Sequence, residues 1–174
     1  GSIASSTVAL LDGAISVFVS GNYAYVASQT SDALEIIDIS NPANPVHKGS
    51  LSHGSGGALL DGVASVFVSG NYAYLASNIS DALEIVDISN PANPVHKGSL
   101  SDGDGVAPFL NGAVSVFVSG NYAYVASQSS HALEIIDISN PASPSHKGSL
   151  SNGTGGALLN TAKSVFVSGN YAYV

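Results

Sequence analysis

The sequence predicts an all-β protein built from one four-stranded unit that is repeated three and a half times. The first observation is internal repetition. The segment from Ser16 to Ser52 matches the segment from Ser65 to Ser101 at 33 of 37 positions, and the segment from Ser115 to Ser151 also matches the first at 33 of 37. The second observation is local pattern, because short runs rich in β-branched and aromatic residues alternate with Gly, Asn and Pro, and no segment has helical periodicity.

The first half of each unit reads as a hairpin. In the first copy, "SVFVS" at 16–20 has the composition of a strand, and "YAYVAS" at 23–28 has that of its partner. Between them, Gly21-Asn22 is a pair that tolerates positive φ and suits a two-residue turn. A loop over 29–33 then leads out of the hairpin.

The second half of each unit adds two more strands. "LEIIDIS" at 34–40 reads as the third strand, and "VHKGSLS" at 46–52 reads as the fourth. The intervening "NPANP" interrupts the ladder, because proline lacks the backbone donor and holds φ near −65°. A Gly-rich stretch at 53–62 connects one unit to the next.

The third strand does not alternate cleanly between apolar and polar residues, which indicates sheets that are covered on both faces. A β-propeller provides such an environment, because its four-stranded antiparallel blades stack around an axis. We therefore predict a single domain of three full blades and a two-stranded half blade. The predicted parts are a tag remnant and linker (1–13), blade 1 (14–62), blade 2 (63–112), blade 3 (113–163) and the half blade (164–174).

Propellers typically close with 4 to 8 blades, so these three and a half blades fall short of closure. The last predicted strand is apolar and would leave its outer edge unpaired, and such edges recruit other chains. We therefore expect a homodimer or higher homo-oligomer that forms through Tyr171, Tyr173 and Val174. The alternative is that the natural protein is longer.

Composition excludes several classes of partner. Twelve acidic residues against four lysines, with no arginine, produce a formal charge of −8. Nucleic acids and anionic membrane surfaces need clustered cations, so neither is an expected partner. The chain has no cysteine, which excludes disulfides and thiolate chemistry. No apolar run approaches the roughly 20 residues that a membrane helix needs.

Repetition also argues against catalysis, because it places the same group at the same position in every blade, whereas an active site brings different groups together. We predict no catalytic residue. His47 and its equivalents recur on the outermost strand and are expected at the surface, and a cross-strand ion pair between Glu35 and Lys48 is expected in each blade. Asp38 and its equivalents are expected to bond local backbone at a turn.

The copies differ mainly in the loop between the second and third strands and in the connection between blades. In an up-and-down blade these two segments emerge on the same face, and binding residues favour loops on rigid scaffolds. We therefore predict a ligand-binding face that includes Gln29, Asp32, His53, Asn78, Asp81, Gln128, His131 and Asn152.

The connection before the third blade contains "DGDG" at 102–105. Asp102 and Asp104 are spaced so that both carboxylates could chelate calcium, although the later ligands of a full calcium loop are missing. Calcium at these two residues is the one cofactor that the sequence suggests.

Three short motifs resemble a known family. "LEIID" at 34–38, "LEIVD" at 83–87 and "LEIID" at 133–137 are each followed by "ISNPA" and preceded by "GNYAYVAS" or "GNYAYLAS". This pattern resembles the LVIVD repeat. The resemblance implies a β-propeller of a secreted or surface-attached protein, and it implies no catalytic residues.

Taken together, the residues and the resemblance favour a non-enzymatic scaffold of a secreted or cell-surface protein that binds protein or glycan. One alternative is a propeller enzyme, hydrolase-like or lactonase-like, with a metal on the axis. Another is a truncated repeat array without a function of its own.

Overall fold

The computed structural model describes residues 1–4, 9–105 and 107–174. This part of the chain forms three antiparallel sheets of four strands and one sheet of two strands, which confirms the predicted all-β propeller fold. Blade 1 comprises β1 (Ala14–Ser20), β2 (Tyr23–Ser28), β3 (Ala33–Asp38) and β4 (Val46–Ser52). Blade 2 comprises β5 (Val63–Ser69), β6 (Tyr72–Ser77), β7 (Ala82–Asp87) and β8 (Val95–Ser101). Blade 3 comprises β9 (Ala113–Ser119), β10 (Tyr122–Ser127), β11 (Ala132–Asp137) and β12 (Ser145–Ser151), and the half blade comprises β13 (Phe166–Ser168) and β14 (Tyr171–Tyr173).

Within each sheet the strands pair in chain order. The predicted two-residue hairpin is confirmed, since β1 ends at Ser20 and β2 begins at Tyr23. Gly21 has a φ of +57°, and a Cβ built there would meet no atom within 4 Å. The left-handed backbone, and not lack of space, therefore favours glycine at this turn.

A β-bulge interrupts the pairing of the third and fourth strands. In blade 1, Ile36 pairs with Gly49, but the next residue, Ile37, pairs with His47. Lys48 is the extra residue, and the same shift recurs in blades 2 and 3. Because side chains alternate along a strand, this insertion changes which fourth-strand side chain shares a face with the third strand.

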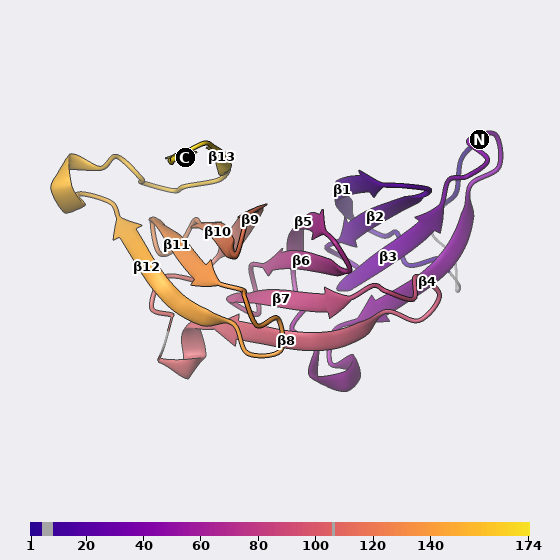
Figure 1. The fold of residues 1–174 in the computed structure, drawn as a ribbon, viewed down its shortest axis with the longest axis horizontal. Helices are drawn as coiled ribbons and strands as arrows, with labels where there is room; N and C mark the ends of the chain where they lie inside the picture. The colour runs from indigo at the N-terminus through magenta and orange to yellow at the C-terminus, as the bar shows by residue number, and fades with distance from the viewer. Residues whose placement is uncertain (5–8, 106) are drawn as a thin grey trace.

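The sheets stack into an open arc. Figure 1 shows β4, β8 and β12 along the outer side of the arc and β1, β5 and β9 along its inner side. The first strands of successive blades contact one another from β1 to β5, from β5 to β9 and from β9 to β13. The first strand of each blade is thus the innermost, as a propeller requires.

The hydrophobic core lies between blades. Tyr25 and Ile36 of blade 1 pack in one buried cluster with Val66 and Val68 of blade 2, and an equivalent cluster joins blades 2 and 3. Blade 2 is therefore covered on both faces, as predicted for a propeller blade. A line of phenylalanine rings runs through the inner strands, with centroids 4.8 to 5.1 Å apart, and links Phe18, Phe67, Phe117 and Phe166.

Candidate interaction surfaces

The loop between the second and third strands bonds to the connection that follows its own blade. Oδ1 of Asp32 accepts a hydrogen bond from the backbone N–H of Gly62 at 2.8 Å, and Oδ1 of Asp81 accepts one from Gly112 at 2.7 Å. Both aspartates have a left-handed backbone, with φ of +49° and +51°. Aspartate tolerates this conformation better than most residues, so it suits the position in both backbone and side chain. The two side chains join successive blades.

In the third loop, His131 takes the place of these aspartates. Its Nδ1 accepts a hydrogen bond from the N–H of Thr161 at 2.9 Å, and its φ of +52° matches theirs. Imidazole accepts at Nδ1 only while that nitrogen carries no proton. At the junction between blade 3 and the half blade, an imidazole nitrogen therefore replaces the carboxylate oxygen as the acceptor.

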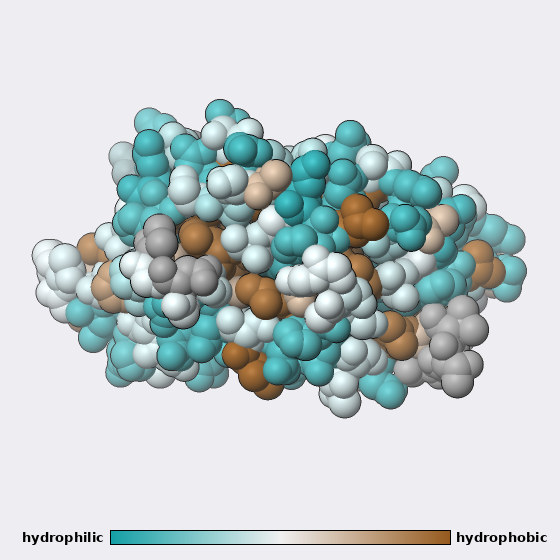
Figure 2. Space-filling view, turned by 90° about the horizontal axis from the view of Figure 1, so that it is seen from below, coloured by the Kyte–Doolittle hydropathy of each residue, from teal (hydrophilic) through white to brown (hydrophobic). Residues whose placement is uncertain are grey.

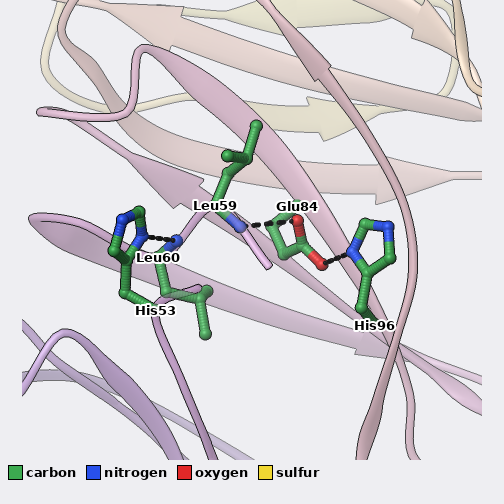
Figure 3. Close-up of polar contacts among 5 residues, drawn as sticks. All are labelled: His53, Leu59, Leu60, Glu84 and His96. Carbon is green, nitrogen blue, oxygen red and sulfur yellow. Dashed lines mark hydrogen bonds and ion pairs between the residues drawn. The ribbon is translucent and has the colours of Figure 1, made fainter. Parts of the chain in front are cut away.

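Hydrogen bonds also form between residues within a single connection. Nδ1 of His53 accepts hydrogen bonds from the N–H groups of Leu60, at 3.1 Å, and Asp61, at 3.0 Å. Figure 3 includes the first of these bonds. In the third connection, Oδ1 of Asn152 accepts from the N–H of Leu159 at 2.8 Å. These two exposed residues shape the connections that carry them.

The remaining predicted ligand residues occupy the start of each loop and are half-buried. Their backbone N–H groups donate to the carbonyl oxygens of the glycines that precede each first strand. The residues concerned are Gln29, Asn78 and Gln128. The structure thus brings the predicted residues onto one set of loops and connections, but it spreads them along the arc and uses most of them in backbone contacts. Ligand binding by this loop face stays a prediction.

A repeated carboxylate that sequence reasoning assigned to a surface ion pair is buried. Glu84 has no exposed surface, and its Oε1 lies 2.6 Å from Nδ1 of His96. Its Oε2 accepts a hydrogen bond from the N–H of Leu59, in the connection that enters blade 2, at 3.0 Å. Figure 3 shows the carboxylate between these two partners. Burial raises the pKa of Glu84 to about 7, although the bonds from Leu59 and His96 lower it.

The same arrangement occurs in blade 1 and corrects the expected ion pair between Glu35 and Lys48. Glu35 is fully buried, and its Oε1 lies 2.5 Å from Nδ1 of His47. Its Oε2 accepts from the N–H of Leu10 at 3.1 Å. The β-bulge is the cause, because in a regular ladder Lys48 would oppose Ile37 and share the face of Glu35, whereas the extra residue moves His47 there. Lys48 instead lies over the ring of Tyr23, with Nζ 6.0 Å from the centroid.

In the described part of blade 3, one oxygen of the buried glutamate lacks the hydrogen bond that it has in blades 1 and 2. Glu134 is fully buried and hydrogen-bonded to Nδ1 of His146, but its Oε2 has no hydrogen-bond partner among the described residues. The residue equivalent to Leu59 is Phe109, and the connection that carries it is one residue longer than the connection before blade 2. Burial raises the pKa of Glu134, and the negative charge of Asp102 adds to the effect.

The predicted calcium residues lie beside this blade. Asp102 begins the short 3-10 helix η2 (Asp102–Asp104), and burial, together with the charge of Asp81, raises its pKa. The side chain of Asp104 lies outside the part of the chain that the structure describes. Within the described part, no group of three or more His, Cys, Asp or Glu side chains could hold a metal ion. Calcium binding stays a prediction.

A separate expectation concerned the aspartate at the end of the third strand. In each blade its Oδ1 accepts a hydrogen bond from the N–H of the serine two residues later, at 2.9 to 3.0 Å. These bonds lower the pKa of all three carboxyls, and they confirm the predicted turn role of Asp38, Asp87 and Asp137.

The first strand of blade 1 presents an uncovered apolar surface. Val17 and Val19 are 62% and 57% exposed, whereas Val66 and Val68, which occupy the same positions in blade 2, are 5% and 6% exposed. Ile15 is also exposed, and it lines a hollow of about 190 Å³ together with Ala14, Ser16, Val17 and Val26. We call the exposed residues Ile15, Val17 and Val19 the N-terminal end face.

The half blade presents a second uncovered apolar surface at the other end of the arc. Tyr173 is 58% exposed, whereas Tyr25 and Tyr74, which occupy the same position in blades 1 and 2, are each 4% exposed. Phe166, Tyr171 and Val174 are exposed as well, in agreement with the expectation of an exposed apolar strand at this edge. We call the exposed residues Phe166, Tyr171 and Tyr173 the C-terminal end face; Val174 alternates to the opposite side of the strand, where it lines a hollow with Leu158 and Leu159.

The side of the arc that carries β4, β8 and β12 has a different character. In Figure 2, which views the molecule from below Figure 1, most of the surface is hydrophilic or neutral and the hydrophobic residues form separate spots. Isolated apolar residues of this kind are ordinary on protein surfaces. The part of the chain that the structure describes also has no helix with the length and apolar character needed to cross a membrane.

Comparison with known proteins agrees with the fold. The LVIVD repeat model matches residues 13–52, 62–102, 112–152 and 160–174. No curated protein matches the sequence. Among solved structures, the β-propeller domain of Cps50 (Swd1) from Myceliophteria thermophila is 14% identical, with a TM-score of 0.61 over 80% of this chain and 43% of that one.

Two further structures have similar scores. The periplasmic gluconolactonase PpgL of Pseudomonas aeruginosa is 13% identical, with a TM-score of 0.64 over 79% of this chain and 39% of that one. The computationally designed protein Ika4 is 10% identical, with a TM-score of 0.64 over 97% of this chain and 91% of that one. The chain spans less than half the length of the two natural propellers, and at these identities the likeness shows the fold alone.

Proposed function

The chain belongs to the LVIVD repeat family and folds as a partial β-propeller, and we propose that it is a non-enzymatic interaction scaffold that binds protein through the two end faces of its arc. The family resemblance supports a place outside the cell or at the cell surface as part of the same proposal.

The observation that carries this proposal is the contrast between equivalent residues. Val17 is 62% exposed and Val66 is 5% exposed, although both lie at the same position of the same strand sequence. Within the chain, the surface that covers Val66 is the apolar face of a neighbouring blade. Contiguous exposed apolar surface marks sites of protein interaction, so the end faces fit a protein better than a glycan.

The repeated polar groups support a scaffold and not a reaction centre. Each buried glutamate bonds the histidine of its own blade, and the loop aspartates bond backbone N–H groups of the following connection. These groups hold the blades together and lie apart from one another along the arc. A catalytic site would instead need several different groups around one point.

The test is the molar mass in solution, measured by light scattering across a concentration series. We expect the wild-type chain to exceed its monomer mass of 17.4 kDa, and we expect Val17→Asp/Tyr173→Asp, which places one charge on each end face, to remain a monomer. The matched control is Ile79→Asp/Val95→Asp, because these exposed apolar residues lie on blade 2, away from both ends. A control variant should keep the wild-type mass.

Two results would contradict the proposal. One is a wild-type chain that stays monomeric at every concentration. The other is an assembly that survives the end-face substitutions but is broken by the control substitutions, which would move the interaction surface to blade 2. Circular dichroism of each variant establishes that a change in mass is not a loss of fold.

A further inference from the structure

We propose that the two end faces are complementary, so that the N-terminal end face of one copy of the chain binds the C-terminal end face of a second copy. In this contact the line of phenylalanines continues from Phe166 to the partner's Phe18. This inference rests on the proposed function and names the partner of the same surfaces. It assigns them a head-to-tail contact between identical chains.

The first argument is chemical complementarity. The N-terminal end face is aliphatic, and the C-terminal end face is largely aromatic. Inside the chain, the aliphatic residues of each first strand pack against the tyrosine of the preceding blade, as Val66 and Val68 do with Tyr25. Val165 and Val167 of the half blade likewise pack in a cluster with Tyr124 of blade 3. The N-terminal end face therefore fits a tyrosine-bearing face better than it fits a copy of itself.

The second argument is a repeated hydrogen bond between blades. Ser16 Oγ accepts from the N–H of Val66, and Ser65 Oγ accepts from that of Val116, both at 3.2 Å. Ser115 makes the third such contact, to Val165 at 3.2 Å. Ser164 is the next serine in the series, and it is exposed on the half blade. In a head-to-tail contact its Oγ would accept from the N–H of Val17 in the second copy.

The third argument is the stacking of the inner rings. Three successive Phe pairs have centroids 4.8, 4.9 and 5.1 Å apart, and the ring of Phe166 is 57% exposed at the end of the line. A second copy that packs on the half blade as one blade packs on the next would bring its Phe18 into contact with the ring of Phe166. Aromatic pairs at such distances attract beyond the burial of their area.

Two copies are enough to use both faces of each chain. Figure 1 shows β1 and β13 on opposite arms of an open arc, so the two end faces of one chain do not cover each other. Two reciprocal contacts would place six four-stranded and two two-stranded sheets around one axis, which is within the range of known propellers. A head-to-tail contact that closes in this way makes a finite assembly, whereas one that does not close makes a filament.

The decisive experiment mixes two single variants. Val17→Asp damages one end face and Tyr173→Asp damages the other, so each variant alone has no intact head-to-tail contact. A 1:1 mixture still pairs the intact C-terminal face of the first with the intact N-terminal face of the second. We expect each variant to have the monomer mass of 17.4 kDa and the mixture to reach twice that mass.

Cysteine crosslinking tests the register of the same contact, because the chain has no cysteine of its own. Under oxidation, a mixture of Ser164→Cys and Val17→Cys chains should form a covalent dimer, and neither variant alone should do so. The doubly substituted chain Ser65→Cys/Val116→Cys is the positive control, since it places the same pair at a junction inside one chain.

The outcomes separate the two proposals. Crosslinking of Val17→Cys or Ser164→Cys chains with themselves would show that like faces meet, and it would overturn the head-to-tail contact. A wild-type assembly with no rescue on mixing would overturn it as well, while leaving the end faces as interaction surfaces. A monomeric wild-type chain would overturn both.

Discussion

Nδ1 of His96 lies 2.6 Å from Oε1 of Glu84, a carboxylate that has no exposed surface. The other oxygen of Glu84 accepts a hydrogen bond from the N–H of Leu59. This one side chain therefore connects β7, on which it lies, with β8 and with the connection that enters blade 2. A buried carboxylate with both oxygens occupied is costly to disturb, because each partner group would be left without its bond. The stability and pH response of the blade should therefore depend on it.

Removing this carboxylate should destabilise the protein. We expect Glu84→Ala to lower the free energy of unfolding by roughly 3 kcal/mol, because it breaks a buried pair and leaves a cavity. Glu84→Gln keeps an acceptor for Leu59 and most of the volume, so we expect a loss of about 1 kcal/mol. Urea unfolding at pH 7 measures both. Equal losses in the two variants would argue against a role for the hydrogen bonds.

The same residue predicts a change of stability with pH. Burial holds the pKa of Glu84 at about 7 in the folded chain, against an ordinary value of 4.5, so the folded state binds more protons between these two pH values. Stability from this group is fully present below pH 4.5 and is lost as pH rises through 7, by up to about 3 kcal/mol. Urea unfolding of the wild type and Glu84→Gln at pH 5 and pH 7.5 isolates the effect. The wild type should lose more stability than the variant on going to pH 7.5, and parallel curves would contradict the assignment.

The loop residue Asp81 should stabilise the junction between blades 2 and 3. Its Oδ1 accepts from the N–H of the buried Gly112, and its own φ is +51°. We expect Asp81→Ala to cost about 2 kcal/mol, since alanine lacks the acceptor and disfavours this backbone. Asp81→Asn keeps both properties and should cost less than about 0.5 kcal/mol. Thermal unfolding compares the two variants, and equal losses of stability would contradict this role of the Asp81 carboxylate.

Glycine on the outer strand allows blades to approach closely. A Cβ added at Gly98 would lie 2.5 Å from the carbonyl oxygen of Pro141 in blade 3, whereas one added at Gly148 would meet no described atom within 4 Å. We expect Gly98→Ala to destabilise the chain by about 2 kcal/mol through overpacking. Gly148→Ala is the matched control and should change stability by less than about 0.5 kcal/mol. Chemical denaturation of both variants is the measurement, and equal effects would refute the contact.

Much of the fold follows from local sequence. The hairpin at Gly21 was predicted because a two-residue turn with positive φ has a strong local preference, and near-identical copies had to adopt the same strands. The turn role of Asp87 was predicted for the same reason, since its partner Ser89 is only two residues away.

The partner of each buried glutamate was not predicted. Sequence reasoning placed Lys48 beside Glu35, which is correct for a regular ladder. The bulge adds one residue and places His47 on that face instead. A shift of one residue exchanges the two faces of a strand, and the letters "VHKGS" do not specify where it occurs. Histidine and lysine are adjacent in every copy, so the sequence offers both as partners of the glutamate and does not choose between them.

The sequence by itself determined the repeat, the strands and the apolar side of each strand, because these depend on residues close together in the chain. The tertiary structure decided which of those sides is covered. Residues 16–20 and 65–69 have the same letters, "SVFVS", yet Val17 is exposed and Val66 is buried. The difference is the neighbouring blade, which packs against one strand and not against the other, and burial of that kind depends on contacts between segments about 50 residues apart.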